Sequence, residues 1–258
     1  MNNLLDIKHL SKNYNSLNGE VEAIQNLSLS IKDGEFLCII GPSGCGKSTI
    51  LNILAGLDMD YKGQVIYKEG ITSSYMTQED ALFPWLSVFD NACIGLKIQN
   101  KLTEESKCYV HYLLDKYGLK DFKNTKITNL SGGMRQRVAL IRTIATKPKL
   151  VFLDEPFSAL DYVSRLKVSD DIYSILKEEG ITCIMVTHDI AEAITLSDRV
   201  VVLSKRPSKI KHIYDINLSD KSTPINNRKS VEFGKYYELL WRDIDDNEWR
   251  TKKVFEKI

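Results

Sequence analysis

A glycine-rich segment, GPSGCGKST at residues 41–49, constrains this chain more than any other part of it. It fits the pattern GxxxxGK[ST], and it lies between an apolar run at residues 35–40 and a helical pattern at residues 47–57. In that context glycines let backbone N–H groups surround phosphate oxygens, and the start of the helix adds its positive end. The segment therefore predicts a strand, a phosphate-binding loop and a helix, and a glycine-rich turn without function is disfavoured.

Within this loop, individual side chains have predicted roles in binding a nucleotide and Mg²⁺. Lys47 is expected to reach the β- and γ-phosphates, and the Ser48 hydroxyl is expected to bind Mg²⁺. The residues predicted to bind ATP are Gly41, Pro42, Ser43, Gly44, Cys45, Gly46, Lys47, Ser48 and Thr49. Cys45 stands beside Lys47 and a helix start, which both favour a thiolate. The sequence therefore predicts that alkylation of Cys45 blocks ATP hydrolysis and that bound ATP protects it.

A second segment, LVFLDEP at residues 150–156, places two carboxylates at the end of a buried strand. Because side chains alternate along a strand, Asp154 and Glu155 are expected to point in different directions. Asp154 is then suited to the Mg²⁺ shell, through water, and Glu155 to polarising a water that attacks the γ-phosphate. An acidic pair that merely ends a strand is the alternative, which the phosphate loop upstream disfavours.

A third segment, LSGGMRQR at residues 130–137, predicts a second anion site. Ser131 can cap a helix, and the amides of Gly132 and Gly133 expose donors at its positive end. Alone, this segment would be interpreted as an ordinary helix start with a serine cap. Together with the other two segments, it indicates an ATPase in which one subunit's nucleotide is completed by another subunit.

Composition excludes several classes of protein. With 258 residues, 43% apolar and 27% charged, the chain can bury a substantial core and is neither disordered nor fibrous. Its net charge of +1 provides no broad field for nucleic acid, and no nucleic acid partner is predicted. No apolar run is long enough to cross a bilayer and the start lacks a leader, so the chain is expected in the cytosol. The five cysteines lack CxxC spacing and are expected to be reduced thiols.

The order of apolar runs predicts an α/β architecture in three parts. Residues 1–82 and 148–205 are expected to form an ATP-binding α/β core with an N-terminal β subdomain. Strands at residues 150–153 and 182–186, joined by a helix at residues 162–178, form a parallel βαβ unit within it. Residues 83–147 are expected to form an inserted helical subdomain. Residues 206–258 are expected to be an extension that packs on the core through a stripe of Phe233, Tyr237, Leu240 and Ile244.

These motifs together resemble the ATP-binding subunits of ABC transporters, and the resemblance extends over nearly the whole chain. It implies a P-loop NTPase fold with a RecA-like core, an N-terminal antiparallel β subdomain and an inserted helical subdomain. It also implies a homodimer in which the signature residues of one subunit meet the γ-phosphate bound by the other. Those residues are Ser131, Gly132, Gly133 and Gln136. The implied substrate is ATP, the implied cofactor is Mg²⁺, and the implied activity is ATP hydrolysis.

The resemblance assigns further residues one by one. Gln78 resembles the Q-loop glutamine, which senses Mg²⁺ and the attacking water, and it is expected to bind Mg²⁺ together with Ser48 and Asp154. A surface glutamine is the alternative for Gln78. His188 follows the apolar run 182–186 and resembles the switch histidine that contacts the γ-phosphate. A lone histidine is more often structural, but its position one strand beyond the two carboxylates reverses that preference.

Two more assignments concern the dimer interface and the adenine ring of ATP. Ser158, Ala159, Leu160 and Asp161 resemble the D-loop that crosses the interface between subunits, although alone they would be interpreted as a helix cap. Tyr14 resembles the aromatic residue that stacks on adenine. The alternative for Tyr14 is an exposed tyrosine in a loop at residues 13–19.

The segment QEDALFPWL at residues 78–86 is similar to bacterial importers of the nitrate, sulfonate and taurine group. Phe83, Pro84 and Trp85 would lie near the groove for a cytoplasmic helix of the membrane subunit, and filling of the chain's own core is an equal alternative. Residues 206–216 and 233–241 are also similar to that group, whereas residues 128–129 depart from it.

The resemblance implies a homodimer beneath two permease subunits, peripheral to the cytoplasmic side of the cell membrane and served indirectly by an extracytoplasmic solute-binding protein. A soluble ABC-type ATPase outside transport is the alternative, although such proteins usually have two fused cassettes or a coiled-coil insertion. A P-loop kinase would have no use for LSGGMRQR. The transported solute is not indicated, because the cassette contacts the permease and never the cargo.

Overall fold

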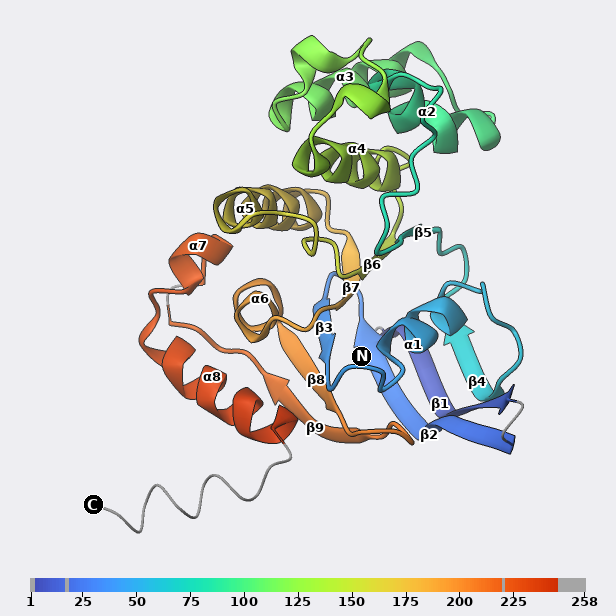
Figure 1. Cartoon of the computed structure of the whole chain (residues 1–258), viewed down its shortest axis with the longest axis vertical. Coiled ribbons are helices and arrows are strands. Elements are labelled where there is room, and N and C mark those ends of the chain that lie inside the picture. Colours follow the sequence, from blue (N-terminus) through green and yellow to red (C-terminus); the bar gives the residue numbers. More distant parts are fainter. Residues whose placement is uncertain (1–2, 17–18, 220, 246–258) are drawn as a thin grey trace.

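Two β-sheets with one helix between them form the body of the molecule in the computed structural model, which describes residues 3–16, 19–219 and 221–245 (Figure 1). The larger sheet has the order β5-β6-β7-β3-β8-β9, and the smaller has the order β2-β1-β4. The smaller sheet is antiparallel, and the larger is parallel except for β9. The fold class predicted from the sequence, a P-loop NTPase with an antiparallel β subdomain, is confirmed.

The larger sheet consists of β3 (Phe36–Ile40), β5 (Ser73–Met76), β6 (Leu150–Asp154), β7 (Thr182–Val186), β8 (Arg199–Leu203) and β9 (Ile210–Asp215). The strands β3, β6 and β7 are buried at every residue, as strands covered on both faces should be. Alternate residues of β3 serve two different cores. Leu37 and Ile39 pack toward the smaller sheet, whereas Cys38 and Ile40 pack toward the other face.

Helices cover both faces of the larger sheet (Figure 1). One face packs on α1 (Lys47–Leu54), which lies between the two sheets. The other face packs on α5 (Tyr162–Glu178), α6 (Ile190–Leu196) and α8 (Val231–Ile244), and a short α7 (Pro224–Asn227) lies beside α5 and α6. The βαβ unit β6-α5-β7 has the helix bounds that the sequence predicts.

The smaller sheet consists of β1 (Asn3–Ser16), β2 (Gly19–Lys32) and β4 (Lys62–Tyr67). Sequence analysis predicts a β subdomain in this part of the chain but does not identify its first strand, β1. Its alternation of apolar and polar residues is broken because the register shifts between Ile7 and Leu10. His9, inside the shift, has a φ of 53°, so Ile7 and Leu10 both reach the core although they are three residues apart.

A helical part projects from the body of the molecule, shown at the top of Figure 1. It contains α2 (Val88–Ile98), α3 (Glu104–Lys116), α4 (Gly132–Ile144) and two short 3₁₀ helices, Lys120–Phe122 and Ile127–Asn129. Each long helix has a side-chain cap, from Ser87, Thr103 and Ser131. These caps satisfy the first backbone donors, so each start is set by local sequence.

The C-terminal part differs from the sequence prediction in two ways. The edge strand β9 was not predicted, because its mostly exposed residues give no alternating pattern. Leu240 of α8 is fully buried and Phe233 and Ile244 pack against the core, but Tyr237 is more than a third exposed. Tyr236 takes its place against the core, since positions 233, 236, 240 and 244 share one face of the helix.

Candidate nucleotide-binding and hydrolysis site

The loop between β3 and α1 has the backbone that the glycines require. Gly44 and Gly46 have φ values of 74° and 104°, a region that residues with side chains rarely adopt. Gly46 caps α1 without a side-chain hydrogen bond, so the first N–H groups of this helix remain available to an anion. A Cβ placed on Gly41 would lie 3.0 Å from Cys45 Sγ and 3.1 Å from Leu203 Cβ, so the loop passes too close for a side chain.

The Lys47 side chain lies inside this loop. Its ammonium group donates to the carbonyl oxygens of Gly41, at 2.9 Å, and Pro42, at 3.1 Å. The residue is buried although it carries a charge. No carboxylate of residues 3–16, 19–219 or 221–245 is paired with it, and a buried ammonium held by carbonyl oxygens is suited to attract phosphate oxygens at the same place.

Asp154 and Ser48 meet across the start of α1. Ser48 Oγ donates to Asp154 Oδ1 at 3.1 Å, and the Tyr75 hydroxyl lies 3.3 Å from Asp154 Oδ2 and 2.9 Å from Asn52 Oδ1. Burial raises the pKa of Asp154, the charge of Glu155 adds to that rise, and the hydrogen bonds from Ser48 and Tyr75 oppose it. A cation beside Asp154 would therefore favour its ionised form. Sequence analysis did not identify Tyr75 or Asn52.

This hydroxyl and carboxylate fit Mg²⁺ that arrives with a nucleotide, because Mg²⁺ is usually held by one or two carboxylates together with substrate phosphates. Within residues 3–16, 19–219 and 221–245, no group of three or more His, Cys, Asp or Glu side chains gathers as a metal site. Ser48 and Asp154 would hold the ion, which would neutralise phosphate charge. Gln78, the predicted third ligand, contacts Glu155 instead, and its role toward Mg²⁺ stays a prediction.

Glu155 lies between the predicted glutamine and histidine. Its Oε2 atom is 3.2 Å from Gln78 Nε2 and 3.2 Å from His188 Nδ1, and no hydrogen bond to Oε1 occurs among the described residues. The backbone leaves the strand here, because Glu155 has a φ of 46° and its N–H donates to Val186 O at 2.9 Å. This turn, and not strand alternation, separates the Glu155 carboxylate from that of Asp154. A non-glycine residue in this conformation costs roughly 1–3 kcal/mol, and such strain is concentrated at functional sites.

The loop after Gln78 is fastened to the helical part by two arginines of α4. Arg135 Nε donates to Asp80 Oδ2 at 3.0 Å. Arg142 donates to the carbonyl oxygens of Ala81, at 2.7 Å, and Asp80, at 2.8 Å. The helix that begins with the signature segment therefore holds the loop that carries Gln78. Sequence analysis missed both arginines, because no local pattern indicates which groups of the loop they bind.

The signature segment and the predicted D-loop lie against each other. Ser131 is exposed and caps α4 by accepting from Met134 N at 3.3 Å. A Cβ on Gly133 would lie 3.2 Å from Leu160 Cδ2, and Asp161 caps α5, as the helix-cap alternative requires. Ser131, Gly132 and Gly133 remain accessible, but Gln136 is buried inside the molecule. Gln136 is only 3% exposed in the single subunit, and its predicted contact with a second subunit stays a prediction.

Tyr14 lies on strand β1, opposite Val21, and not in the loop of the alternative interpretation. Its ring is partly exposed, and its hydroxyl donates to Thr49 Oγ1 at 3.3 Å, which places the ring next to the phosphate-binding loop. The ammonium of Lys12, which is paired with Asp58 at 2.9 Å, lies 4.9 Å from the centre of the ring. These contacts position an aromatic face where a base could stack.

Cys45 differs from the expectation of a reactive thiolate. It is only 1% exposed, packed in the core between α1 and the smaller sheet. Burial raises the pKa of the Cys45 thiol, and this effect outweighs the opposing charge of Lys47. The expectation was wrong because proximity to a helix start and a lysine favours a thiolate only where the sulfur is solvated.

The C-terminal part contacts the phosphate-binding loop. Arg206 donates from its guanidinium to Gly44 O at 2.7 Å.

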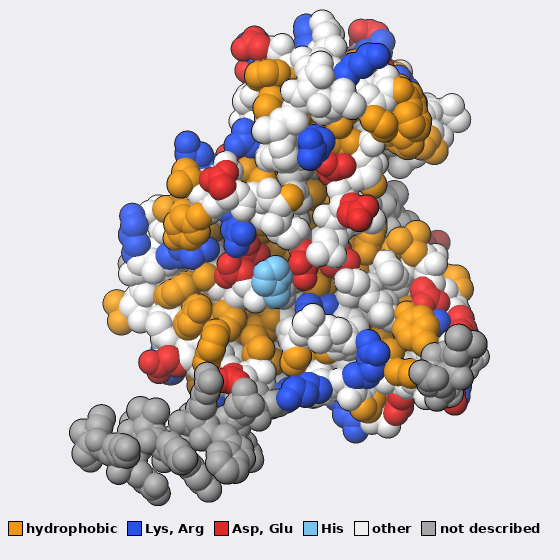
Figure 2. Space-filling view, viewed as in Figure 1, with side chains coloured by type: hydrophobic (Ala, Val, Ile, Leu, Met, Phe, Trp, Pro, Cys, Tyr) orange, Lys and Arg blue, Asp and Glu red, His pale blue; other side chains and the backbone are white. Residues whose placement is uncertain are grey.

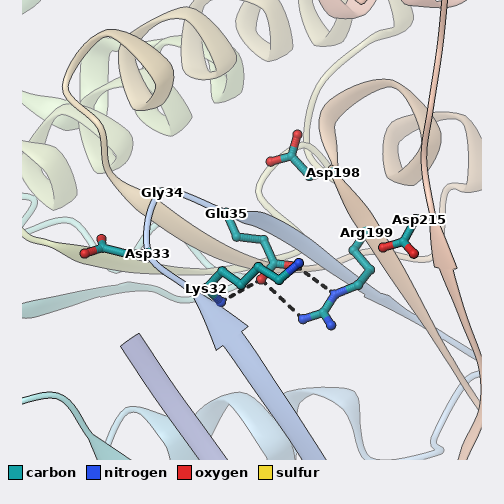
Figure 3. A pocket seen from close by; sticks show the side chains of 7 residues that line it. All are labelled: Lys32, Asp33, Gly34, Glu35, Asp198, Arg199 and Asp215. Carbon is teal, nitrogen blue, oxygen red and sulfur yellow. Dashed lines mark hydrogen bonds and ion pairs between the residues drawn. The ribbon is translucent and has the colours of Figure 1, made fainter. Parts of the chain in front are cut away.

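A separate cavity of about 250 Å³ lies at the opposite end of strands β3 and β8 (Figure 3). There Glu35 is paired with Arg199 at 2.7 Å, and Asp198 binds Lys177 at 2.8 Å. Since open α/β sheets bind ligands at the carboxyl ends of their strands, this cavity is not the nucleotide site.

The aromatic residues after the Gln78 loop lie at the surface. Trp85 is 68% exposed, and its ring centre lies 5.3 Å from that of Phe83. These side chains do not fill the chain's own core. Figure 2 also shows apolar side chains gathered over the part of the surface where Figure 1 places α2, and a group of acidic side chains beside a histidine below the helical part.

Comparison with known proteins agrees with this site. The model of the ABC transporter family matches residues 24–158. The taurine import ATP-binding protein TauB of Roseobacter denitrificans is 38% identical over 254 residues, which cover 95% of this chain and 95% of that protein. The nitrate import ATP-binding protein NrtD of Synechocystis sp. is 38% identical over 247 residues, which cover 92% and 93% respectively. The dimeric ATP-binding cassette MJ0796, solved with ADP and Pi, has a TM-score of 0.73 and 29% identity and covers 83% of this chain and 99% of its own.

The sheet, the phosphate-binding loop and the carboxylates beyond it define a P-loop ATPase. Within that class, the matched segment and the relatives show that the chain belongs to the ABC transporter family, as one of its ATP-hydrolysing cassettes. Among the described residues, none of the helices has the length and apolar character that crossing a bilayer needs.

The cysteines provide a test of this site geometry. Cys108 is exposed, whereas Cys38, Cys45, Cys93 and Cys183 are buried. In the native protein we expect N-ethylmaleimide to modify Cys108 at least about tenfold faster than Cys45, because only an accessible thiolate reacts. Peptide mass spectrometry would measure the two rates, and Cys108→Ser should remove the fast phase without loss of ATP hydrolysis. Rapid labelling of Cys45 would contradict the buried position of its sulfur.

Proposed function

We propose that the chain is the ATP-hydrolysing subunit of an ABC importer for a small solute of the taurine, sulfonate or nitrate kind. The import ATP-binding proteins TauB and NrtD match it over 95% and 92% of its length. The observation that supports hydrolysis is the Glu155 carboxylate, which is held between Gln78 and His188 beside the phosphate-binding loop. The subunit works on the cytoplasmic side of the cell membrane.

Each side chain of the site has a role in hydrolysis in this proposal. The amides of the loop and the Lys47 ammonium bind the β- and γ-phosphates, while Ser48 and Asp154 hold Mg²⁺. Tyr14 stacks on adenine. Glu155 accepts a proton from the attacking water, and Gln78 and His188 orient its carboxylate. His188, which follows β7, also contacts the γ-phosphate in this proposal.

The proposed working unit is a homodimer that closes on two ATP molecules. Ser131, Gly132 and Gly133 present the positive end of α4 at the surface, where they can bind a γ-phosphate held by the second subunit. The cassette MJ0796 is dimeric in its solved structure. Closure on ATP and reopening after hydrolysis would move two attached permease subunits between their outward- and inward-facing states.

The permease is proposed to bind near Trp85 and Phe83. These exposed aromatic rings follow the loop that carries Gln78, so the binding surface and the hydrolysis site belong to one segment of chain. Exposed aromatic side chains are enriched at protein interfaces. Arg135 and Arg142 connect the same loop to the signature helix, which allows movement of the permease to reach both halves of the ATP site.

Removal of the Glu155 charge tests the assignment of the general base. We expect Glu155→Gln to lower turnover roughly 10²–10⁴-fold, the usual contribution of a general base, while ATP binding persists. The variant should accumulate as an ATP-bound dimer in gel filtration. Glu69→Gln makes the same change at an exposed position and should hydrolyse ATP normally. Normal turnover in Glu155→Gln would exclude this role.

A bulky cation at the signature segment tests the composite site. We expect Ser131→Arg to bind a fluorescent ATP analogue normally but to lose ATP-driven dimerisation and roughly 10²-fold in hydrolysis, because the anion donors at the start of α4 become blocked. Ser222→Arg, at an exposed position of the C-terminal part, serves as the control. Preserved dimerisation in Ser131→Arg would contradict the proposed interface.

Substitution of Trp85 tests the permease surface and the transport function. We expect Trp85→Ser to keep the ATPase activity of the isolated protein and to lose roughly tenfold in affinity for the permease, as for a tryptophan at the centre of an interface. Ile98→Ser, at another exposed apolar residue, is the control. Copurification with the permease and uptake of labelled taurine or nitrate by membrane vesicles would measure the effect. Unchanged copurification would exclude this surface, and a complex that takes up neither solute would exclude the proposed solute class.

A further inference from the structure

We propose that Arg165 is a positioning residue that connects the D-loop of each subunit to the switch histidine of the same subunit. Through this connection, contact at the partner's ATP would influence hydrolysis of the subunit's own ATP. The inference rests on the proposed dimer, in which each ATP is bound by both subunits. Arg165 itself does not contact nucleotide in that dimer.

Arg165 lies in the first turn of α5 and reaches three groups with one guanidinium. Its Nη2 atom donates to Leu160 O in the D-loop at 3.3 Å, and its Nη1 atom donates to Asp189 Oδ2 at 3.4 Å. Its Nε atom lies 3.8 Å from Glu192 Oε1. A planar guanidinium has donors in a fixed geometry, so movement of one partner is transmitted to the others.

The groups on one side of Arg165 hold the backbone around His188. Asp189 caps α6 by accepting from Ala191 N at 2.8 Å and Glu192 N at 3.1 Å. The Thr187 hydroxyl donates to Glu192 Oε2 at 2.6 Å and accepts from Asp189 N at 3.0 Å. Both neighbours of His188 are therefore bound within one network. The His188 side chain is 64% exposed and reaches Glu155 from this fixed base.

The group on the other side of Arg165 belongs to the segment that packs on the signature helix. Leu160, whose carbonyl binds Arg165, has a buried side chain close to Gly133. Ala159 O would lie 3.8 Å from a Cβ on Gly132. In the proposed dimer these glycines serve the partner's ATP. A displacement at that contact therefore reaches Leu160 directly and Arg165 through one hydrogen bond.

The network is incomplete in this structure. Arg165 Nε is buried and has no hydrogen bond among the described residues, although the Glu192 carboxylate is 3.8 Å away. Charge-assisted hydrogen bonds are about 2.7–2.9 Å long, so a relative movement of about 1 Å between α5 and α6 would form one. A buried donor without a partner favours such a movement. In this proposal, closure of the dimer on ATP brings the Arg165 Nε atom and the Glu192 carboxylate into hydrogen-bond distance.

Steady-state kinetics can separate this role from simple fastening of two helices. We expect Arg165→Met to lower kcat about tenfold, as for loss of a charge-assisted hydrogen bond, with less than about a twofold change in the KM for ATP. In a Glu155→Gln background, Arg165→Met should still form the ATP-bound dimer. Lys177→Met removes an ion pair between the same helix and Asp198, away from both loops, and should leave kcat unchanged.

A double-mutant cycle tests whether Arg165 acts through Glu192. The effects of Arg165→Met and Glu192→Gln on kcat should be strongly non-additive, whereas those of Lys177→Met and Glu192→Gln should add. Arg165→Lys keeps the charge but cannot bridge three groups. Its melting temperature should therefore be closer to that of the unaltered protein than the melting temperature of Arg165→Met, whereas its kcat should stay as low as that of Arg165→Met. Additive effects, or an Arg165→Met enzyme with full kcat per folded molecule, would overturn the inference. Absence of an ATP-driven dimer in Glu155→Gln alone would instead refute the proposed composite site.

Discussion

The parallel pairing of β3, β6 and β7 is the constraint on which the rest of the structure depends. Because the three strands run in one direction, the phosphate-binding loop, the Asp154–Glu155 turn and the segment with His188 all begin at the same edge of the sheet. The strands are buried on both faces, and that burial holds the three loops in a fixed relation. Chemistry that is spread over nearly 150 residues of sequence is therefore assembled within hydrogen-bond distance.

Local motifs allowed much of this arrangement to be predicted, because the glycine-rich loop and the α5 bounds depend on nearby residues. Strand β1 could not be predicted, since its bulge at His9 hides the apolar alternation. The burial of Cys45 depends on packing against the smaller sheet, which no local pattern reveals. The roles of the site residues stay predictions, although the structure brings Gln78, Glu155 and His188 together.

Arginine side chains on two helices bind the loops beside the nucleotide site. Arg142 of α4 binds the backbone of the loop after Gln78, and Arg165 binds the backbone of the D-loop. In each case a long side chain on a rigid helix holds carbonyl oxygens of a loop. Such bonds constrain the course of a loop while leaving its catalytic side chain able to move, which suits loops that must respond to nucleotide and to a partner.

The antiparallel strand β9 makes the C-terminal part integral to the cassette. Residues 200–203 of β8 are completely or almost completely buried, and β9 covers the edge of this strand, which would otherwise expose its unpaired backbone groups. The turn that leads into β9 also carries Arg206, which holds the carbonyl of Gly44. Truncation after residue 205 would therefore create an aggregation-prone sheet edge and loosen the phosphate-binding loop together, so the smallest autonomous ATP-binding unit of this chain extends beyond its family motifs.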